Sequence, residues 1–325
     1  MNFLSLFNGK SSGYTACELA EIEIGTYYSA EVDKYAIQVG DAIHPEQVQL
    51  GDVTKWRDWD IDWSSIDMIF GGFPCQTWSV AGKQMGDKDE RGMLFWTMLD
   101  IMKHVRHHNP KAKFIIENVK MKKEFEEYIT HHMAESLGMF EYDPEKTGEA
   151  EYLIEEYGKT PLYKILIDSA LVSAQSRKRY YWTSFPVEQP EDRGIVLADI
   201  IESDVDNVFY YSQKSIDYME RGNDKWMQAG SRRADRYTQS QSDAKSFTLT
   251  ANMHKGVPYN YFQEESGRYR KKTPRECFRL QTVPEHYIDK ILSCGVSNTQ
   301  LYKIAGNGWT DEVIAHILRC SKNNH

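Results

Sequence analysis

Cysteine is sparse in this 325-residue sequence, and its positions exclude several classes of protein. The five cysteines include no CxxC pair, which argues against a disulfide framework and a zinc site and favours a reducing compartment. No uninterrupted apolar run approaches the roughly 20 residues that cross a bilayer, and residues 2–7 are too short and uncharged for a signal peptide. We therefore expect a cytoplasmic protein that holds no metal and contacts no membrane. The cysteines are Cys17, Cys75, Cys277, Cys294 and Cys320.

Basic residues are also fewer than acidic ones, but they are distributed unevenly along the chain. The formal net charge is −9, yet between residues 213 and 275 there are 13 Lys and Arg against 7 Asp and Glu. Because local charge decides how a surface meets phosphate, the acidic total does not exclude nucleic acid as a partner. A solvated, loop-rich surface has the same composition, so charge alone leaves both interpretations open.

The first half of the chain alternates short β-like runs with helical stretches, which predicts an α/β protein with a mostly parallel sheet wrapped by helices. After Phe185 the pattern becomes irregular and rich in polar and basic residues. We therefore predict a larger domain of residues 1–185, completed by 300–325, and a smaller one of residues 186–299. The acidic stretch 141–156 is expected to be an exposed insertion. The expected strands are 3–7, 26–32, 48–53, 68–73, 113–119, 163–171 and 179–185, the last two as an antiparallel pair, and the expected helices are 13–21, 94–105, 122–137 and 310–320.

Cys75 directly follows one of these strands, and open α/β sheets form their sites at strand ends. Pro74 fixes the backbone before it, and Gly71 and Gly72 leave room for a substrate to approach. Taken alone, such a cysteine is more often buried and inert. The polar stretch from Gln76 onward predicts a loop that can close over a ligand.

A carboxylate and two cations follow Cys75 in the sequence. Glu117 ends the predicted strand 113–119, where a carboxylate is costly to desolvate unless it is used or paired. Asn118 is placed to hold it, and Arg177 and Arg179 come later in the chain. A thiol, an acid and a cationic pair suit the activation of a pyrimidine ring toward methyl transfer.

Three more strand ends suggest a cofactor that contains a nucleoside. The first predicted strand runs into a glycine-bearing turn, residues 7–13, which brings backbone N–H groups close to a ligand. Glu31 ends the second strand, where a carboxylate can accept both ribose hydroxyls. Asp52 follows the third and can accept from an adenine amino group. Each acid alone could be an exposed turn residue, but the combination favours a cofactor site.

Together these segments resemble the DNA (cytosine-5) methyltransferase family, in the family's order and through nearly the whole chain. The nucleophile motif matches Gly72-Phe73-Pro74-Cys75-Gln76, the acid motif Glu117-Asn118-Val119, and the basic motif Gln175-x-Arg177-x-Arg179. The sequence departs from the family's pattern at Lys10, Ala174, Gly308 and Trp309. The other matching segments are residues 7–13, 31–36, 51–53, 81–84, 91–95, 274–280 and 305–308.

The resemblance implies a Rossmann-like S-adenosylmethionine-dependent methyltransferase sheet and a smaller, irregular target-recognition domain. It implies that Cys75 adds to C6 of a flipped-out cytosine while Glu117 meets N3, so that C5 takes the methyl group from S-adenosyl-L-methionine. Arg177 and Arg179 are expected to hold the base and a phosphate, with Gln76, Ser79 and Asn118 beside them. The expected cofactor contacts are Phe7, Gly9, Ser11, Ser12, Gly13, Glu31, Val32, Asp52, Val53, Pro74, Leu94, Asn307 and Gly308.

The smaller domain is expected to read a short site in double-stranded DNA. Most of its basic residues are predicted to contact phosphate, which positions the protein without specifying sequence. We expect a monomer, acting at the nucleoid of a bacterial or phage-infected cell and not physically associated with any cognate restriction endonuclease. The candidate DNA contacts are Arg232, Arg233, Arg236, Thr248, Asn252, Lys255, Arg268, Arg270, Lys271 and Lys272.

Two alternatives remain. The same chemistry could act on a tRNA cytosine, which the basic stretch 213–275 and its DNA-type recognition pattern disfavour. A non-catalytic regulatory relative would be expected to have lost Cys75, Glu117 or the cofactor acids, and all of these are present.

Overall fold

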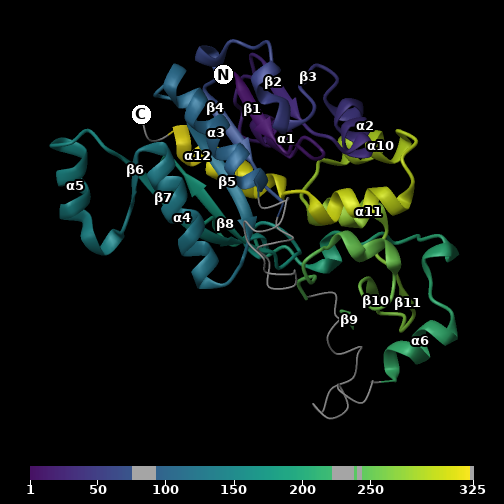
Figure 1. The fold of residues 1–325 in the computed structure, drawn as a ribbon. Coiled ribbons are helices and arrows are strands. Elements are labelled where there is room, and N and C mark those ends of the chain that lie inside the picture. The colour runs from purple at the N-terminus through teal and green to yellow at the C-terminus, as the bar shows by residue number, and fades with distance from the viewer. Residues whose placement is uncertain (75–92, 222–237, 240–243, 323–325) are drawn as a thin grey trace.

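The main body of the molecule is an eight-stranded sheet with strand order β3-β2-β1-β4-β5-β8-β7-β6 (Figure 1). The computed structural model describes residues 1–74, 93–221, 238–239 and 244–322. The strands are β1 (Phe3–Leu6), β2 (Tyr27–Ala30), β3 (Val48–Gln49), β4 (Met68–Gly71), β5 (Lys113–Val119), β6 (Met139–Glu141), β7 (Thr160–Asp168) and β8 (Lys178–Thr183).

Strand direction divides this sheet into two parts. The strands β1 to β5 are mutually parallel, with Phe3 of β1 opposite both Tyr27 of β2 and Met68 of β4. The strand β8 runs antiparallel to both β5 and β7, which confirms the predicted antiparallel pair. The strand β6, which the sequence did not predict, adds to β7 in parallel at the edge. The predicted α/β class, with a mostly parallel central sheet, is confirmed.

Alternating side chains of the parallel strands enter two separate cores. Leu4 and Ile69 pack against α3 (Met93–His108) and α4 (Lys123–Leu137). Phe3 and Phe70 face the opposite side, where α1 (Ser12–Leu19) and α12 (Asp311–Lys322) cover the sheet. Because strands that are buried on both faces need apolar residues throughout, these strands have nearly continuous apolar sequences.

Four helices form a third core beside the sheet. This cluster joins α2 (Lys34–Ile43) to α9 (Pro274–Leu280), α10 (Glu285–Ser293) and α11 (Asn298–Asn307). None of these four helices was predicted from the sequence. Residues 274–293, which we expected to belong wholly to the smaller domain, therefore pack against a helix of the first fifty residues. The division into domains at residues 186 and 299 stays a prediction.

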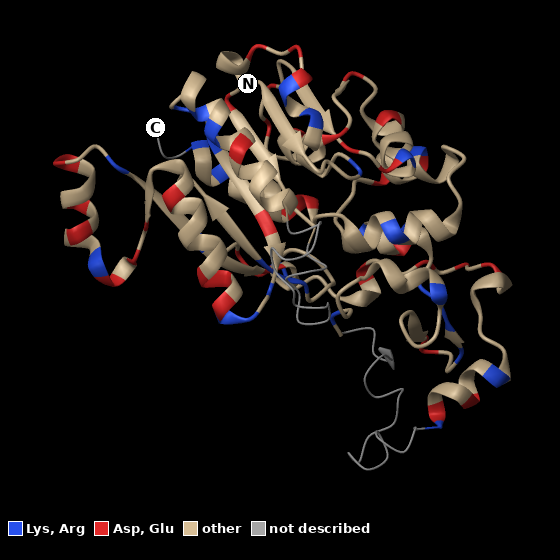
Figure 2. Cartoon of the chain, viewed as in Figure 1, with Lys and Arg blue, Asp and Glu red and all other residues tan. Residues whose placement is uncertain are grey.

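A small sheet and a short helix lie away from the main sheet (Figure 1). The strands are β9 (Thr238–Gln239), β10 (Tyr261–Gln263) and β11 (Tyr269–Arg270), near α6 (Gln213–Glu220). At the opposite end of the molecule, α5 (Thr147–Glu155) carries the exposed residues Glu149, Glu151 and Glu155 (Figure 2). Among the residues that the structure covers, no helix is long and apolar enough to cross a bilayer.

Gly306 lets α11 cross the backbone of residues 250–251 at close range. A Cβ at this position would come within 2.2 Å of the Thr250 carbonyl carbon and 2.5 Å of the Ala251 nitrogen. We expect Gly306→Ala to lower the free energy of unfolding by about 3 kcal/mol, because backbone cannot yield as a flexible side chain can. Gly148→Ala is the matched control: it adds a Cβ in an exposed helix with nothing within 4 Å. Urea titration of both variants checks this, and equal effects would contradict the packing argument.

Candidate active site

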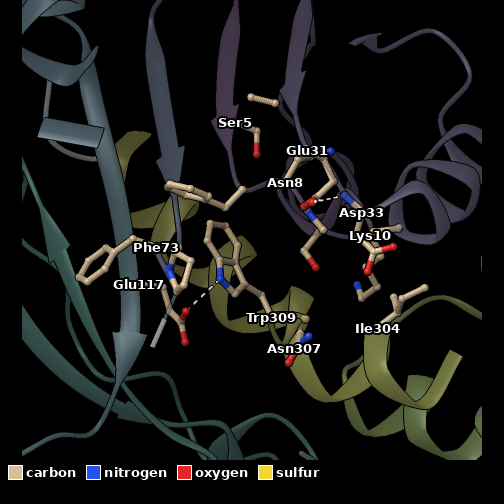
Figure 3. A pocket seen from close by; sticks show the side chains of 18 of the residues that line it. Ser5, Asn8, Lys10, Glu31, Asp33, Phe73, Glu117, Ile304, Asn307 and Trp309 are labelled. Carbon is tan, nitrogen blue, oxygen red and sulfur yellow. Dashed lines mark hydrogen bonds between the residues drawn. The ribbon is translucent and has the colours of Figure 1, made fainter. Parts of the chain in front are cut away.

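A cavity of about 370 Å³ opens at the carboxyl ends of β1, β2, β4 and β5 and is closed by the turn between α11 and α12 (Figure 3). Parallel α/β sheets bind ligands at this edge because the helix N-termini and loops gather there. Most of the predicted site residues that the structure describes line it: Phe7, Gly9, Ser12, Glu31, Val32, Asp52, Val53, Pro74, Leu94, Glu117, Asn118, Arg177, Arg179, Asn307 and Gly308.

Two predicted site residues that the structure describes, Ser11 and Gly13, do not line this cavity. Ser11 is buried and donates to Gln47 Oε1 at 2.8 Å, so it shapes the turn from behind. Gly13 backs onto the Phe70 and Tyr27 side chains. Cys75, Gln76 and Ser79 lie outside the described residues.

The turn after β1 takes an unusual backbone path. Phe7, Gly9 and Ser11 have φ angles of 57°, 57° and 65°, in the left-handed region that costs a non-glycine residue free energy. Buried hydrogen bonds from Asn8 Nδ2 to Ser29 Oγ (2.7 Å) and Ser11 Oγ (2.8 Å) stabilise this path. The turn is therefore held rigidly against the cavity.

Glu31 organises the end of β2. Its Oε2 accepts from the Gly9 N–H at 2.7 Å, and its Oε1 accepts from the Val32 and Asp33 N–H groups at 2.8 and 2.9 Å. The carboxylate thus ties two neighbouring strand ends together in the cavity wall. Asp52 lines the same wall and accepts from the Thr54 N–H at 2.8 Å. Both acids are positioned by backbone and keep acceptor capacity for a ligand.

A buried ion pair joins the first turn to the start of α12. Lys10 Nζ lies 2.6 and 2.7 Å from the two carboxylate oxygens of Asp311, and both side chains are fully buried. Burial lowers the pKa of Lys10 and raises the pKa of Asp311, and the attraction between the charges opposes both shifts. The cation at position 10, a departure from the family's pattern, therefore has a specific partner 301 residues away.

We expect Lys10→Met to lower the free energy of unfolding by about 3–5 kcal/mol, because Asp311 is left buried and unpaired. In the double variant Lys10→Met/Asp311→Leu most of this loss is expected to be recovered, since neither charge remains to be desolvated. Chemical denaturation of the two variants makes the comparison. A single variant within about 1 kcal/mol of the parent protein would show that the pair does not act as a unit.

Glu117 is held by donors from two other segments. It lies opposite Tyr181 in the β5–β8 register, and Arg179 lies opposite Val119, so both side chains share one face of the sheet. Arg179 Nε is 2.9 Å from Glu117 Oε1. Trp309 Nε1 donates to Glu117 Oε2 at 3.1 Å. Glu117 is only 8% exposed, but each of its carboxylate oxygens has a donor, which makes its burial tolerable.

Two neighbours act differently from what the sequence suggested. Asn118 Nδ2 donates to the Phe73 carbonyl at 3.1 Å, so it fastens the β4 end and does not bond Glu117. The Arg177 guanidinium donates to the carbonyls of Leu249, Gly306 and Gly308 at 2.9–3.2 Å and is 3% exposed. Arg177 therefore links the cavity wall to α11 and to residue 249 through hydrogen bonds. Arg177 also lines the cavity, and its contact with the base stays a prediction.

The predicted DNA contacts fall into four groups. Lys255 and Arg268 are exposed and Lys271 is half-buried, whereas Arg232, Arg233 and Arg236 lie outside the described residues. Thr248 donates to the Ser176 carbonyl at 2.6 Å, and Asn252 is half-buried at the start of a short helical turn.

The prediction that Arg270 and Lys272 contact DNA is corrected, because both side chains are buried. Arg270 is fully buried and bonds Glu264 at 2.5 Å and Glu276 at 2.7 Å, joining β11 to α9. Lys272 is 4% exposed and lies over the Phe262 ring, and burial lowers its pKa to about 8. We withdraw both as phosphate contacts.

The sheet order and the position of the cavity define the class: an open α/β fold whose ligand site lies at the carboxyl ends of its strands. The chain belongs to the C-5 cytosine-specific DNA methylase family, whose model matches residues 1–220 and 199–323. This confirms the family resemblance and the predicted enzyme class, DNA (cytosine-5)-methyltransferase.

Individual relatives agree with this assignment. Type II methyltransferase M1.ScrFI of Lactococcus lactis subsp. cremoris is 31% identical over 291 residues, covering 88% of this chain and 69% of that protein. Type II methyltransferase M.DsaV of Dactylococcopsis salina is 26% identical over 333 residues, covering 98% and 85%.

Solved structures share the fold at low sequence identity. The Entamoeba histolytica methyltransferase EhMeth has a TM-score of 0.71 at 15% identity, covering 100% of this chain and 99% of that one. A Spodoptera frugiperda DNMT2 variant has a TM-score of 0.66 at 18% identity, covering 98% of each chain.

The sequence did not identify several residues of the cavity. Asn8, Asp33, Ile304 and Trp309 line it, and Asp311 neutralises a lysine that does. For Asn8 and Asp33 a signal existed, because each adjoins a predicted cofactor residue. Trp309 was visible only as a departure from the family's pattern beside Gly308.

Proposed function

We propose that this enzyme transfers a methyl group from S-adenosyl-L-methionine to C5 of a flipped-out cytosine in a short duplex DNA site. One observation carries the proposal. The paired carboxylate of Glu117 lies in the wall of the same cavity that Glu31 and Asp52 line. One cavity of a size suited to a small molecule is thus lined both by a carboxylate that can serve the cytosine and by carboxylates that can bind a nucleoside.

The residues of the cavity fit S-adenosyl-L-methionine by their chemistry. Glu31 offers carboxylate oxygens for ribose hydroxyls, and Asp52 offers an acceptor for an adenine amino group. Gly9 lines the cavity with a φ of 57°, in the left-handed region that favours glycine, so backbone lies close to the ligand space there. When bound, the cofactor supplies an electrophilic methyl group on a sulfonium.

In the proposed reaction the Cys75 thiolate forms a bond to C6 of the cytosine. Glu117 protonates or hydrogen-bonds N3, so negative charge does not accumulate on the ring. The resulting enamine makes C5 nucleophilic, and C5 bonds to the methyl carbon as the bond from that carbon to sulfur breaks. A base then removes the C5 proton, and the S–C6 bond breaks to release Cys75 and restore the aromatic ring.

The base has to leave the helix for this chemistry. Neither a thiol nor a carboxylate can approach C6 and N3 of a stacked, paired cytosine, so the proposal includes flipping. Pro74, which directly precedes Cys75, lines the cavity and supports this arrangement. We propose that Gln76 and Ser79 act beside the flipped base.

We propose residues 186–299 as the target-recognition domain and Lys255 as one of its phosphate contacts. Lys255→Ala is expected to weaken DNA binding about equally on all sequences and to reduce the salt slope of log K by about 1. Lys290→Ala, an exposed lysine on α10, is the control and is expected to leave both unchanged. Fluorescence anisotropy over a salt series makes the measurement, and an unchanged slope for Lys255→Ala would contradict the assignment.

The proposed function is tested by methyl incorporation from labelled cofactor into unmodified duplex DNA and into tRNA in parallel. The expected result is label in DNA only, and bisulfite sequencing of that DNA would report the base and its sequence context. Label in tRNA alone would overturn the proposal in favour of the RNA substrate.

A further inference from the structure

Trp309 stands between the two ends of the cavity, beside the cofactor-side segment 306–308 (Figure 3). Its indole packs over Gly72, where a Cβ would come within 3.0 Å of Nε1. It also meets the Phe70 ring edge-on, with 6.3 Å between the centroids. The backbone of β4 therefore leaves a slot that fits this ring.

In this position the indole N–H of Trp309 lies within hydrogen-bonding distance of Glu117. Trp309 Nε1 donates to Glu117 Oε2 at 3.1 Å, while Arg179 Nε is 2.9 Å from Oε1. Each carboxylate oxygen thus has one fixed donor, and the two donors come from different segments. Because each oxygen has two lone pairs, one stays free to carry the proton that is given to the base nitrogen, without breaking either contact.

We infer that Trp309 is a positioning residue for Glu117 and ties the acid to the segment that lines the cofactor end. This inference rests on the proposed function, in which Glu117 serves the cytosine N3. A carboxylate with a single donor can rotate about its last bond, whereas a second donor on the other oxygen fixes its plane. The bulky residue at position 309, which departs from the family's pattern, thereby has a role in the chemistry.

The test separates the N–H group from the ring. Trp309→Phe keeps an aromatic ring in the Gly72 slot and removes the donor together with part of the indole, a loss of volume that the control below shares. We expect kcat to fall about 10- to 100-fold, as when a group that orients a reacting residue is lost, with KM for DNA within about twofold.

Trp59→Phe is the matched control. The Trp59 indole N–H is buried and has no hydrogen-bond partner in the described part of the chain, so the same substitution removes no hydrogen bond there. We expect it to keep the parent kcat and KM. Thermal unfolding of both variants monitors folding, and a rise in KM for DNA with an unchanged kcat in Trp309→Phe would overturn the inference.

A second readout needs neither cofactor nor DNA. The ¹⁵N-indole resonance of Trp309, assigned by its disappearance in Trp309→Phe, is expected to shift in Glu117→Gln. An unshifted resonance would overturn the inference. Failure of the proposed function looks different: the parent enzyme then methylates no DNA, while the indole resonance still responds to residue 117.

Discussion

Replacing Cys75 with alanine is expected to abolish methyl transfer to DNA. The proposed reaction depends on a sulfur–C6 bond, because cytosine C5 is otherwise too weak a nucleophile to take the methyl group. Loss of the nucleophile is expected to reduce kcat by about 10⁴-fold or more. Methyl incorporation from labelled cofactor into unmodified genomic DNA measures the effect.

DNA and cofactor binding provide the controls for Cys75→Ala. Both affinities are expected to stay near those of the parent protein, because the thiol acts in the chemical step. Cys294→Ala, at a half-buried cysteine near the C-terminus of α10, is expected to keep full activity. Turnover retained by Cys75→Ala would refute the covalent mechanism.

Glu117→Gln is expected to have the second largest effect, a fall in kcat of about 10²- to 10⁴-fold. The amide keeps the length of the side chain but cannot give a proton to the base. It also presents an N–H₂ group to one of the two donors that now hold the carboxylate, Arg179 and Trp309. KM for cofactor is expected to change little, because Glu31 and Asp52 are proposed to hold the adenosine part.

Steady-state kinetics at saturating DNA measure the effect of Glu117→Gln. Glu149→Gln on the exposed helix α5 is the matched control and is expected to behave as the parent enzyme. A rise in KM for cofactor with unchanged kcat in Glu117→Gln would contradict a role for Glu117 in the chemical step and would assign it to ligand binding.

Much of the sheet could be predicted from the sequence because its signals are local. Strands such as Lys113–Val119 are short apolar runs between turn residues, and β5 matches its predicted range. The strand β6 was missed because its three residues pair only at the edge, next to an acidic stretch. The helices α9 to α11 were missed because their buried faces pack on α2 and on one another.

The candidate site likewise contains residues that could be predicted from the sequence and residues that could not. Glu31 and Asp52 follow strands and Glu117 lies near the end of one, so their convergence at one sheet edge follows from the strand pattern. The contacts of Trp309 and Asp311 could not be predicted, because their partners lie 192 and 301 residues away. From sequence alone, an arginine is expected to be exposed unless a carboxylate is known to lie beside it. The burial of Arg270 beside Glu264 and Glu276 was therefore not predicted.

The covalent step can be tested directly with duplex DNA in which every cytosine is 5-fluorocytosine. Fluorine at C5 cannot leave as a proton does, so the bond between the enzyme and C6 should persist after methyl transfer. With the cofactor present, we predict a denaturation-stable protein–DNA complex whose peptide map places the nucleotide on Cys75. No complex on DNA that the protein binds, or a nucleotide on another cysteine, would contradict the account.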